Sequence, residues 1–327
     1  MIDRRHLLLG AAALPALSGG PTALAQERWP ARNINMIVPY PPGGQADFAG
    51  RPVAQALEKI LGRGVIVDNR GGAGGAIGNA AAARSAPDGY TILIGLAVLA
   101  VLPEADRLFG RQPAYEIKQL APVARILADP ALLAVPASAP WKTAQEFIAD
   151  AKKRPGAISY GSSGVYGTTH IAMEILAQGA DIKLLHVPYR GVGPAVTGML
   201  GGQIQAMASA PGSVKEHADA GTFRILANFG EERIPSVPHG PTIKELGFKD
   251  VVYYNWAGLF VPQGVPEPIM KQLRDAMAKA MKDPDVIRIF ENGGSAAAYQ
   301  DAPAFAKFFE TDSARLIPVL KKIGKVE

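Results

Sequence analysis

One stretch of the sequence decides the fold class: Ile34-Asn35-Met36-Ile37-Val38-Pro39-Tyr40-Pro41-Pro42-Gly43-Gly44-Gln45-Ala46-Asp47. Its apolar residues at 34–40 predict a strand, its prolines and glycines predict a tight turn, and periodic apolar residues over 46–61 predict a helix. Asp47 is placed to cap the start of that helix. A strand, a glycine-rich turn and a helix in this order form the basic unit of an α/β protein.

The same unit returns in the second half of the chain, where a strand at 158–160 precedes a glycine–serine loop at 161–167 and a helix at 168–178. Apolar runs predict further strands at 65–68, 90–95, 123–135, 184–188, 204–208, 224–228 and 256–261. Helical periodicity predicts further helices at 77–85, 144–153, 193–201, 266–282 and 302–323.

The length of 327 residues corresponds to about two domains. Asp129-Pro130 interrupts the long strand at 123–135, and that strand and the one at 256–261 are natural crossings between domains. We therefore expect an insertion, in which residues 26–126 and 251–327 form domain 1 and residues 127–250 form domain 2.

Residues 1–25 have the pattern of an export signal. Arg4 and Arg5 precede a short apolar run at 7–17, and Ala23-Leu24-Ala25 provides a cleavage site. The run is shorter than the roughly 20 residues that a membrane-spanning helix needs. Both the Sec route and the twin-arginine route fit this signal. We expect a protein that is exported to the periplasm and does not span the membrane.

Composition excludes several classes of function. The chain has no cysteine, so disulfides, thiol nucleophiles and cysteine-bound metals are excluded. Its 34 Lys and Arg residues against 29 Asp and Glu residues give a formal net charge of +5. These charges are spread along the chain without basic runs, so we expect no nucleic-acid partner.

Both glycine loops are candidate anion sites. Each follows a strand and precedes a helix, so the free N–H groups and the positive dipole end of the helix face the loop. The loop at 161–169 adds the hydroxyls of Ser162, Ser163, Thr168 and Thr169, which are more than one helix start can use as caps. If the two loops belong to opposite domains and face one another, they would hold a dianion at both ends. The alternative for each loop is an ordinary turn between a strand and a helix.

Motifs for catalysis or cofactor binding are missing. The run at 71–78 follows a strand, but its glycines do not match G-x-G-x-x-G, and we interpret it as the structural start of a helix. Ser163 has Gly161 before it and Val165 after it, so there is no G-x-S-x-G motif. The histidines lack metal-type spacing. We expect no enzyme activity, no cofactor and no metal.

At this point the residues are recognisable as those of a family. The chain resembles the substrate-binding proteins of tripartite tricarboxylate transporters, the TctC or Bug family, over essentially the whole sequence after the signal. The residues that carry the resemblance are, in order, those at 37–44 with Asp47, 67–70, 72–75, 86–91, 160–162 with His170, 186–191, 256–262 and 264–266.

The resemblance implies a type II periplasmic-binding-protein fold, a Venus flytrap of two α/β domains joined by a hinge. It also implies a ligand that is a small organic carboxylate: a di- or tricarboxylate, an amino acid or an aromatic acid. In the family, backbone N–H groups, hydroxyls and waters of two loops hold the carboxylates. Carried over to this sequence, the ligand-binding residues are Pro42, Gly43, Gly44, Gln45, Ala46, Asp47, Ser162, Ser163, Gly164, Gly167, Thr168 and Thr169, with Tyr189 and Arg190 flanking the cleft.

One charged residue and two departures from the family pattern bear on the nature of the ligand. Arg190 is a plausible partner of a ligand carboxylate, with a surface or interdomain ion pair as the alternative. The family usually has Asp after an apolar residue where this chain has Ile204-Gln205. Residues 96–102 are all apolar where polar residues are common in the family. If this apolar stretch borders the cleft, the ligand has an apolar body.

We therefore expect a monomeric periplasmic solute-binding protein that captures a small organic carboxylate for the membrane subunits of a transporter. Two alternatives stay open on the sequence alone. One is a sensor module that presents its ligand to a membrane signalling protein. The other is a hydrolase that uses Ser163.

Overall fold

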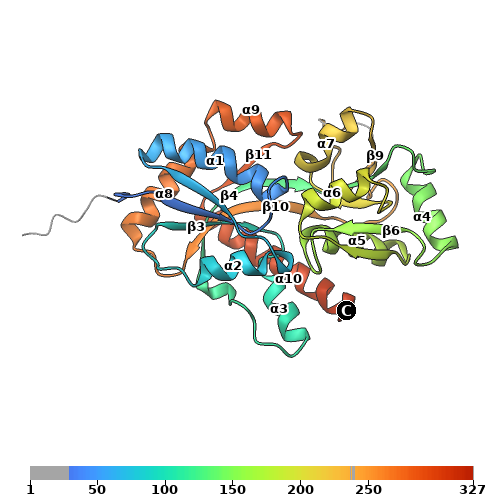
Figure 1. The fold of residues 1–327 in the computed structure, drawn as a ribbon, viewed down its shortest axis with the longest axis horizontal. Helices are drawn as coiled ribbons and strands as arrows, with labels where there is room; N and C mark the ends of the chain where they lie inside the picture. The colour runs from blue at the N-terminus through green and yellow to red at the C-terminus, as the bar shows by residue number, and fades with distance from the viewer. Residues whose placement is uncertain (1–28, 236, 238–239, 327) are drawn as a thin grey trace, which may run out of the picture.

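Short apolar runs and glycine turns build two lobes that lie side by side, with the chain crossing between them (Figure 1). This computed structural model describes residues 29–235, 237 and 240–326. The predicted export signal at 1–25 lies outside the described residues.

The larger lobe contains a six-stranded sheet with the strand order β11-β4-β10-β3-β1-β2. Strand β1 pairs in parallel with both β2 and β3, whereas β10 is antiparallel to β3 and β4. The strands are β1 (Ile34–Val38), β2 (Val65–Asn69), β3 (Thr91–Leu96), β4 (Leu120–Pro130), β10 (Tyr254–Pro262) and β11 (Ala297–Gln300).

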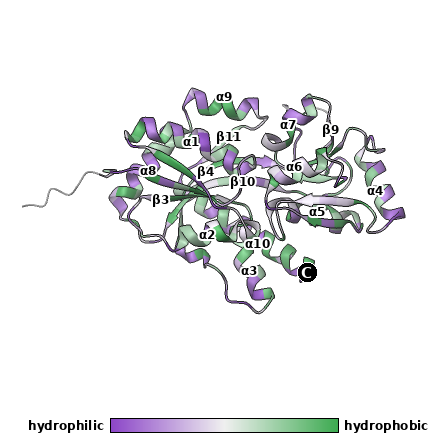
Figure 2. Cartoon of the chain, in the orientation of Figure 1, coloured by the Kyte–Doolittle hydropathy of each residue, from purple (hydrophilic) through white to green (hydrophobic). Residues whose placement is uncertain are grey.

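Helices cover both faces of this sheet (Figure 1). One face carries α1 (Gln45–Leu61), α8 (Glu267–Ala280) and α9 (Pro284–Asn292), whose buried side chains join one hydrophobic cluster with the sheet. The other face carries α2 (Ala76–Ala83), α3 (Val101–Leu108) and α10 (Ala302–Ile323). The central strands are hydrophobic and the helices alternate between hydrophobic and hydrophilic residues (Figure 2), as a layered α/β arrangement requires.

The smaller lobe has a three-stranded antiparallel sheet and a parallel pair of strands. The three-stranded sheet has the order β8-β5-β9, and the pair is β6 with β7. These strands are β5 (Leu132–Pro136), β6 (Ser159–Ser162), β7 (Leu185–Pro188), β8 (Met207–Ser209) and β9 (Phe223–Asn228). Four helices surround them: α4 (Ala144–Lys153), α5 (Thr168–Ala180), α6 (Val192–Leu200) and α7 (Pro211–Asp219).

The predicted interruption at Asp129-Pro130 is confirmed, because β4 ends at Pro130 and β5 begins at Leu132 in another sheet. The chain returns to the larger sheet at Tyr254, which pairs with Pro130. Both crossings therefore lie next to each other between the lobes. The division into domains at 126 and 250 stays a prediction.

Most of the predicted elements occur within a few residues of their expected bounds. The patterns did not predict three helices, α3, α7 and α9, or the short edge strand β11. Each of the three helices has a proline in its first three residues, Pro103, Pro211 and Pro284. Proline fits the first turn of a helix, where its missing N–H is not needed, but in a sequence it also signals a loop.

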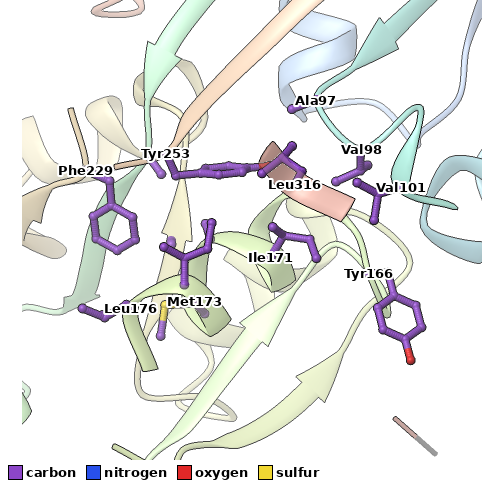
Figure 3. Packing of buried hydrophobic residues seen from close by; sticks show 14 of the residues in the cluster. Ala97, Val98, Val101, Tyr166, Ile171, Met173, Leu176, Phe229, Tyr253 and Leu316 are labelled. Atoms are coloured by element: carbon purple, nitrogen blue, oxygen red, sulfur yellow. The ribbon is translucent and has the colours of Figure 1, made fainter. Parts of the chain in front are cut away.

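A continuous hydrophobic cluster joins the two lobes beneath the cleft. Figure 3 shows Val98 and Val101 of the larger lobe close to Leu316 of α10 and Ile171 of α5. Helix α10 packs against both α3 and α5. The lobes are thus connected by apolar packing as well as by the two crossings.

A buried polar group lies where the strands cross. Asp129 pairs with Asn255 in the β4–β10 register, and both side chains are at most 5% exposed. The Oγ of Ser295 donates to Asp129 at 2.9 Å, and Gln45 Nε2 donates to the carbonyl oxygen of Asn255 at 2.6 Å. Burial raises the pKa of Asp129 to about 7, although hydrogen bonds from Ser295 and Gln45 lower it. The side-chain amide nitrogen and oxygen of Asn255 have no hydrogen-bond partner in the described chain.

The raised pKa of Asp129 predicts a pH-dependent loss of stability. Between about pH 4 and pH 7 the folded protein keeps the proton that the unfolded chain has released, so the free energy of unfolding falls as the pH rises through this window. Asp129→Asn removes this dependence and keeps a side chain of the same shape. Because one pKa unit corresponds to about 1.4 kcal/mol, the variant should gain on the order of a few kcal/mol over the wild type by pH 8. Urea unfolding of both proteins from pH 4 to pH 8 measures the difference.

Asp285→Asn is the control for this experiment. A hydrogen bond from Arg288, followed by one from Lys59, lowers the pKa of Asp285, so its effect on the pH dependence should be small and of opposite sign. A constant difference between the wild type and Asp129→Asn across the whole pH range would contradict the prediction.

Candidate functional site

Four glycine-containing loops meet where the lobes face one another. Strands β1 and β2 are parallel neighbours in the larger lobe, and β6 and β7 are parallel neighbours in the smaller lobe. The carboxyl ends of parallel neighbours lie at the same edge of a sheet, which is where α/β proteins place their ligand sites. The loops after β1 and β2 therefore lie together, as do the loops after β6 and β7.

The loops make close backbone contact across the cleft in two pairs. A β-carbon on Gly193 would lie 2.9 Å from the carbonyl oxygen of Pro42, and one on Gly74 would lie 2.9 Å from that of Val165. The loop after β1 thus meets the start of α6, and the loop after β2 meets the loop after β6. The sequence led us to expect that the loops at 41–47 and 161–169 would face one another. In the structure each of them faces a different glycine loop, because each sheet edge contributes two loops.

A cavity of about 330 Å³ lies between the lobes at the second pair of loops. Its wall comes from the loop after β2, from α3 and the turn that follows, and from the loops after β6 and β7. Single residues of the loop after β1 and of the C-terminal segment complete it. The lining residues are Tyr40, Gly72, Ala73, Gly74, Gly75, Ala76, Leu102, Ala105, Asp106, Phe109, Arg111, Ser163, Gly164, Val165, Tyr166, Tyr189, Arg190 and Val326.

Two further grooves adjoin the loop after β1, with volumes of about 600 and 650 Å³. Pro42 borders both of them. Arg190 borders the first groove as well as the cavity, and Tyr189 borders the second as well as the cavity. Tyr189 and Arg190 thus border both the cavity and a neighbouring groove.

The helices that start at the cleft have no side-chain caps. Helices α1, α2, α5 and α6 begin after glycines, namely Gly44, Gly75, Gly167 and Gly191, and none of these starts receives a side-chain cap. By contrast, Thr143, Asp283 and Asp301 cap α4, α9 and α10 with their side chains. The positive ends of four helix dipoles are therefore left facing the region between the lobes.

Two backbone amides on opposite walls of the cavity are unused by the described part of the chain. Neither the N–H of Gly74 nor that of Val165 has a hydrogen-bond acceptor there. Gly74 is buried. Buried N–H groups without a partner are rare in proteins, so these two amides are free to donate to a bound molecule or to water.

The hydroxyls of the loop at 161–169 are mostly used inside the loop. Thr169 Oγ1 accepts from the Ser163 amide at 2.6 Å and donates to Ser163 Oγ at 3.1 Å. Ser162 Oγ lies 2.6 Å from His186 Nε2 and 3.2 Å from the amide of Gly164. Among the serines and threonines of this loop, only Ser163 lines the cavity. The surplus hydroxyls therefore shape the loop by satisfying its backbone.

Aromatic rings stack directly beneath this loop. The rings of His170 and His186 are 4.0 Å apart and nearly parallel, and Tyr160 stacks on His186 at 5.0 Å. Burial, with a smaller contribution from His186, lowers the pKa of His170 to about 3, and burial lowers the pKa of His186 to about 4. Both imidazoles are neutral at physiological pH, and His170 Nδ1 accepts from the Tyr166 amide at 2.8 Å. The histidines support the loop and bring no charge to it.

This arrangement differs from a serine hydrolase. Ser163 Oγ contacts Thr169, and no imidazole of the described chain is bonded to it. The serine that does contact a histidine, Ser162, is completely buried. Across the described ranges, no group of three or more His, Asp or Glu side chains could hold a metal ion.

Asp47 stabilises the loop after β1 in a way that differs slightly from the expected cap. Helix α1 begins one residue earlier than predicted, with Gly44 at the N-cap, so Asp47 lies in the first turn. Its Oδ2 accepts from the Gly43 amide at 3.2 Å, while Oδ1 accepts from Asn69 and pairs with Arg51. Burial raises the pKa of Asp47, but hydrogen bonds from Arg51, Asn69 and Gly43 outweigh burial and lower it overall.

The other predicted residues of the α1 start are turned inward. Gln45 and Ala46 are buried, and Gln45 reaches the crossing strands through Asn255. Gly43 and Gly44 lie against Gly193 and Val192 of the smaller lobe. Gly167 and Thr168 start α5 behind the cavity wall. Of these residues, none lines the cavity.

The two predicted flanking residues do line the cavity. The Tyr189 hydroxyl donates to Gln203 at 3.1 Å, and its amide donates to Ser162. The guanidinium of Arg190 has no hydrogen bond and no ion pair within the described ranges. The ion pair considered as an alternative for Arg190 is therefore not present in the described chain.

The apolar stretch at 96–102 has a structural explanation. Only Leu102 of this stretch lines the cavity, whereas Ala97, Val98 and Val101 belong to the hydrophobic cluster that joins the lobes (Figure 3). These side chains pack in the hydrophobic cluster and do not line the cavity. The apolar character of the stretch is therefore explained by packing and is not evidence for an apolar ligand.

One wall of the cavity consists of residues that were not predicted from the sequence as ligand-binding. Residues 72–76 start α2 as expected, but they also line the cavity opposite Gly164. The signal that would have found this loop is its position after a strand parallel to β1. The turn after α3 and the C-terminal Val326 gave no local signal, because tertiary packing alone brings them to the cavity.

Comparisons with known proteins agree with this architecture. The family model "Tripartite tricarboxylate transporter family receptor", TctC, matches residues 49–325. A UPF0065 protein from the tcbD–tcbE intergenic region of Pseudomonas sp. (strain P51) is 33% identical, over 96% of this chain and 93% of its own length. Protein BugT of Bordetella pertussis is 32% identical, over 94% of each chain.

Solved structures are similar over nearly the whole chain. A periplasmic transporter protein is 36% identical with a TM-score of 0.85, over 90% of this chain and 98% of its own. MatC of Rhodopseudomonas palustris with bound malate is 27% identical with a TM-score of 0.83, over 89% of this chain and 100% of its own. Another R. palustris protein, with adipate, is 28% identical with a TM-score of 0.82, over 90% of this chain and 97% of its own.

These similarities confirm the expected fold class, a two-domain α/β fold of the type II periplasmic-binding-protein class. Members of the family are substrate-binding proteins and not enzymes. Within the described ranges no helix is both long and apolar enough to cross a bilayer. Four glycine loops at the carboxyl ends of parallel strands, a cavity between two lobes and a family match over 49–325 lead to one assignment: this chain belongs to the TctC family of tripartite tricarboxylate transporter receptors.

Proposed function

We propose that this protein is an exported, monomeric receptor that captures a small organic carboxylate between its lobes and delivers it to the membrane subunits of a tripartite tricarboxylate-type transporter. Residues 1–25 would direct the chain to the periplasm and be removed there, through the Sec or the twin-arginine route. The carboxylate would bind in the cavity of about 330 Å³.

The pair of unused amides on opposite walls of the cavity is the observation that supports this proposal most directly. Gly74 belongs to the larger lobe and Val165 to the smaller one, and each residue adjoins a helix start without a side-chain cap. Backbone N–H groups at helix starts attract anions and need no charged side chain to do so. An anion bound there would draw donors from both lobes and so favour the closed arrangement.

Side chains at the cavity also favour an anion. Arg190 lacks a carboxylate partner in the described chain, so a ligand carboxylate would pair with it at little cost. The neutral state of His170 and His186 leaves the hydrogen-bonded shape of the loop unchanged around neutral pH. The similar proteins that hold malate and adipate are carboxylate binders, and malate and adipate are the first ligands to test here.

The predicted binding residues divide into two groups under this proposal. Ser163, Gly164, Tyr189 and Arg190 would contact the ligand directly, together with the newly found loop at 72–76. The remaining residues would position these loops or reach the ligand through water. They are Pro42, Gly43, Gly44, Gln45, Ala46, Asp47, Ser162, Gly167, Thr168 and Thr169.

A ligand screen by thermal unfolding tests the carboxylate class. A ligand at 100 times its Kd adds about 2.7 kcal/mol to the free energy of unfolding, which corresponds to a shift of several degrees for a protein of this size. We expect stabilisation by malate, adipate or another small acid, confirmed by isothermal titration calorimetry. Silence across carboxylates, together with a response to sugars or metal cations, would overturn the proposed ligand class.

Gly164→Ala tests whether the loops must approach closely. Gly164 has φ +124°, and a β-carbon there would lie 3.2 Å from the Gly74 nitrogen on the opposite wall. The substitution should push the two loops apart and weaken carboxylate binding about tenfold or more, measured by calorimetry. Gly156→Ala is the matched control, because Gly156 also has a positive φ of +75° but has no atom within 4 Å of the new carbon.

Both substitutions introduce backbone strain, on the order of 1–2 kcal/mol for a residue that lacks glycine's freedom. Thermal unfolding should therefore show a modest loss of stability in both variants, and calorimetry should show a loss of binding in Gly164→Ala alone. Unchanged affinity in Gly164→Ala would exclude this loop from the binding site.

A further inference from the structure

Arg111 lies in the turn after α3 and lines the cavity between the lobes. Its guanidinium lies over the ring of Phe109, 4.5 Å from the ring centroid. It has no hydrogen bond and no ion pair with the described residues. Arg107, one helical turn earlier, is different: it pairs with Glu104 and Glu116 and does not line the cavity.

The turn that carries Arg111 is held firmly in place. The backbone carbonyl oxygen of Asp106 accepts hydrogen bonds from the amides of Phe109 at 3.1 Å and Arg111 at 2.9 Å. The side-chain carboxylate of Asp106 accepts one from the Ala114 amide at 3.2 Å. The ring of Phe109 also packs edge-on against Tyr166 of the smaller lobe, with centroids 6.3 Å apart. Arg111 is thus presented by a structured turn and not by a free loop.

The lining of the cavity combines positive groups from two parts of the fold with apolar side chains. Arg190 and the free amides bring positive potential from the glycine loops, and Arg111 brings it from the turn after α3. Leu102, Ala105 and Val326 provide apolar surface in the same wall. Asp106 is the one acidic residue in the lining, and its carboxylate already accepts a hydrogen bond from its own turn.

We propose that Arg111 is a specificity-determining residue, which selects acids that carry a second anionic group beyond an apolar chain. This inference rests on the proposed function, since it assumes that a first carboxylate binds at the glycine loops. The second anionic group would pair with the guanidinium of Arg111, which has no partner to give up. Phe109 would keep the guanidinium flat against its ring by a cation–π contact.

The position of Arg111 at the cavity explains why an ion pair with the ligand would raise the affinity. Ion pairs that are open to water contribute little. Arg111 is exposed in the free protein, so its pairing with a ligand gains strength because the bound ligand itself displaces water from the cavity. We therefore expect a difference of about tenfold in affinity between an acid with a second anionic group and the same acid without it.

Matched pairs of ligands test this inference on the full chain. The diacids from succinate to suberate are compared with their monomethyl esters by isothermal titration calorimetry. In the wild type, the best diacid should bind about tenfold more tightly than its half-ester. Arg111→Gln should weaken binding of that diacid about tenfold and leave the half-ester unchanged. Arg111 is exposed, so the substitution should leave the unfolding midpoint of the free protein in place.

Arg107→Gln is the matched control, because it removes the same charge from the same part of the molecule, away from the cavity. It should leave both affinities unchanged. Equal binding of diacid and half-ester to the wild type, an equal loss of both in Arg111→Gln, or the same losses in Arg107→Gln would each overturn the role of Arg111 while carboxylate binding stands. Failure of every carboxylic acid to bind the wild type would overturn the proposed function and this inference together.

Discussion

The close backbone approach of four glycine loops is the constraint on which the rest of the site depends. Parallel pairing of β1 with β2 and of β6 with β7 brings two loops to the cleft from each lobe. Where the lobes meet, a β-carbon at Gly193 or Gly74 would lie within 3 Å of a backbone oxygen. Such contacts need glycine. Other glycines at these loops occupy the N-cap positions of α1, α2, α5 and α6, which therefore have no side-chain caps. The close approach of the loops and their attraction for anions thus both depend on glycines at these loops, although on different ones.

Polar side chains around the loops mainly preserve this geometry. Asp47 holds the loop after β1 through Gly43, and Thr169 holds the loop after β6 through Ser163. Neutral, stacked histidines support the second loop from below. Positive potential in the cavity therefore comes from helix starts and from Arg111 and Arg190, and the buried hydroxyls and imidazoles contribute shape.

The connection between the lobes combines apolar and polar elements. A hydrophobic cluster that includes Val98, Ile171 and Leu316 runs beneath the cavity, and the two crossing strands meet at Asp129 and Asn255. Through Gln45, this buried polar group also contacts the start of α1, directly after the loop of β1. A change at the crossing would therefore reach the cleft through one helix start.

The sequence alone determined the α/β class, the two glycine loops at 41–44 and 161–167 and the interruption at Asp129-Pro130, because strands, glycine turns and prolines leave local signals. It did not determine which loops face one another. Strand order decides that, and strand order results from contacts between distant segments. For the same reason the loop at 72–76, Arg111 and Val326 came to light only in the structure. The apolar stretch at 96–102 pointed to the ligand in the sequence, but tertiary packing shows that most of it faces α5 and α10. Local chemistry predicted the kind of site, and the packing of the two lobes decided which residues form it.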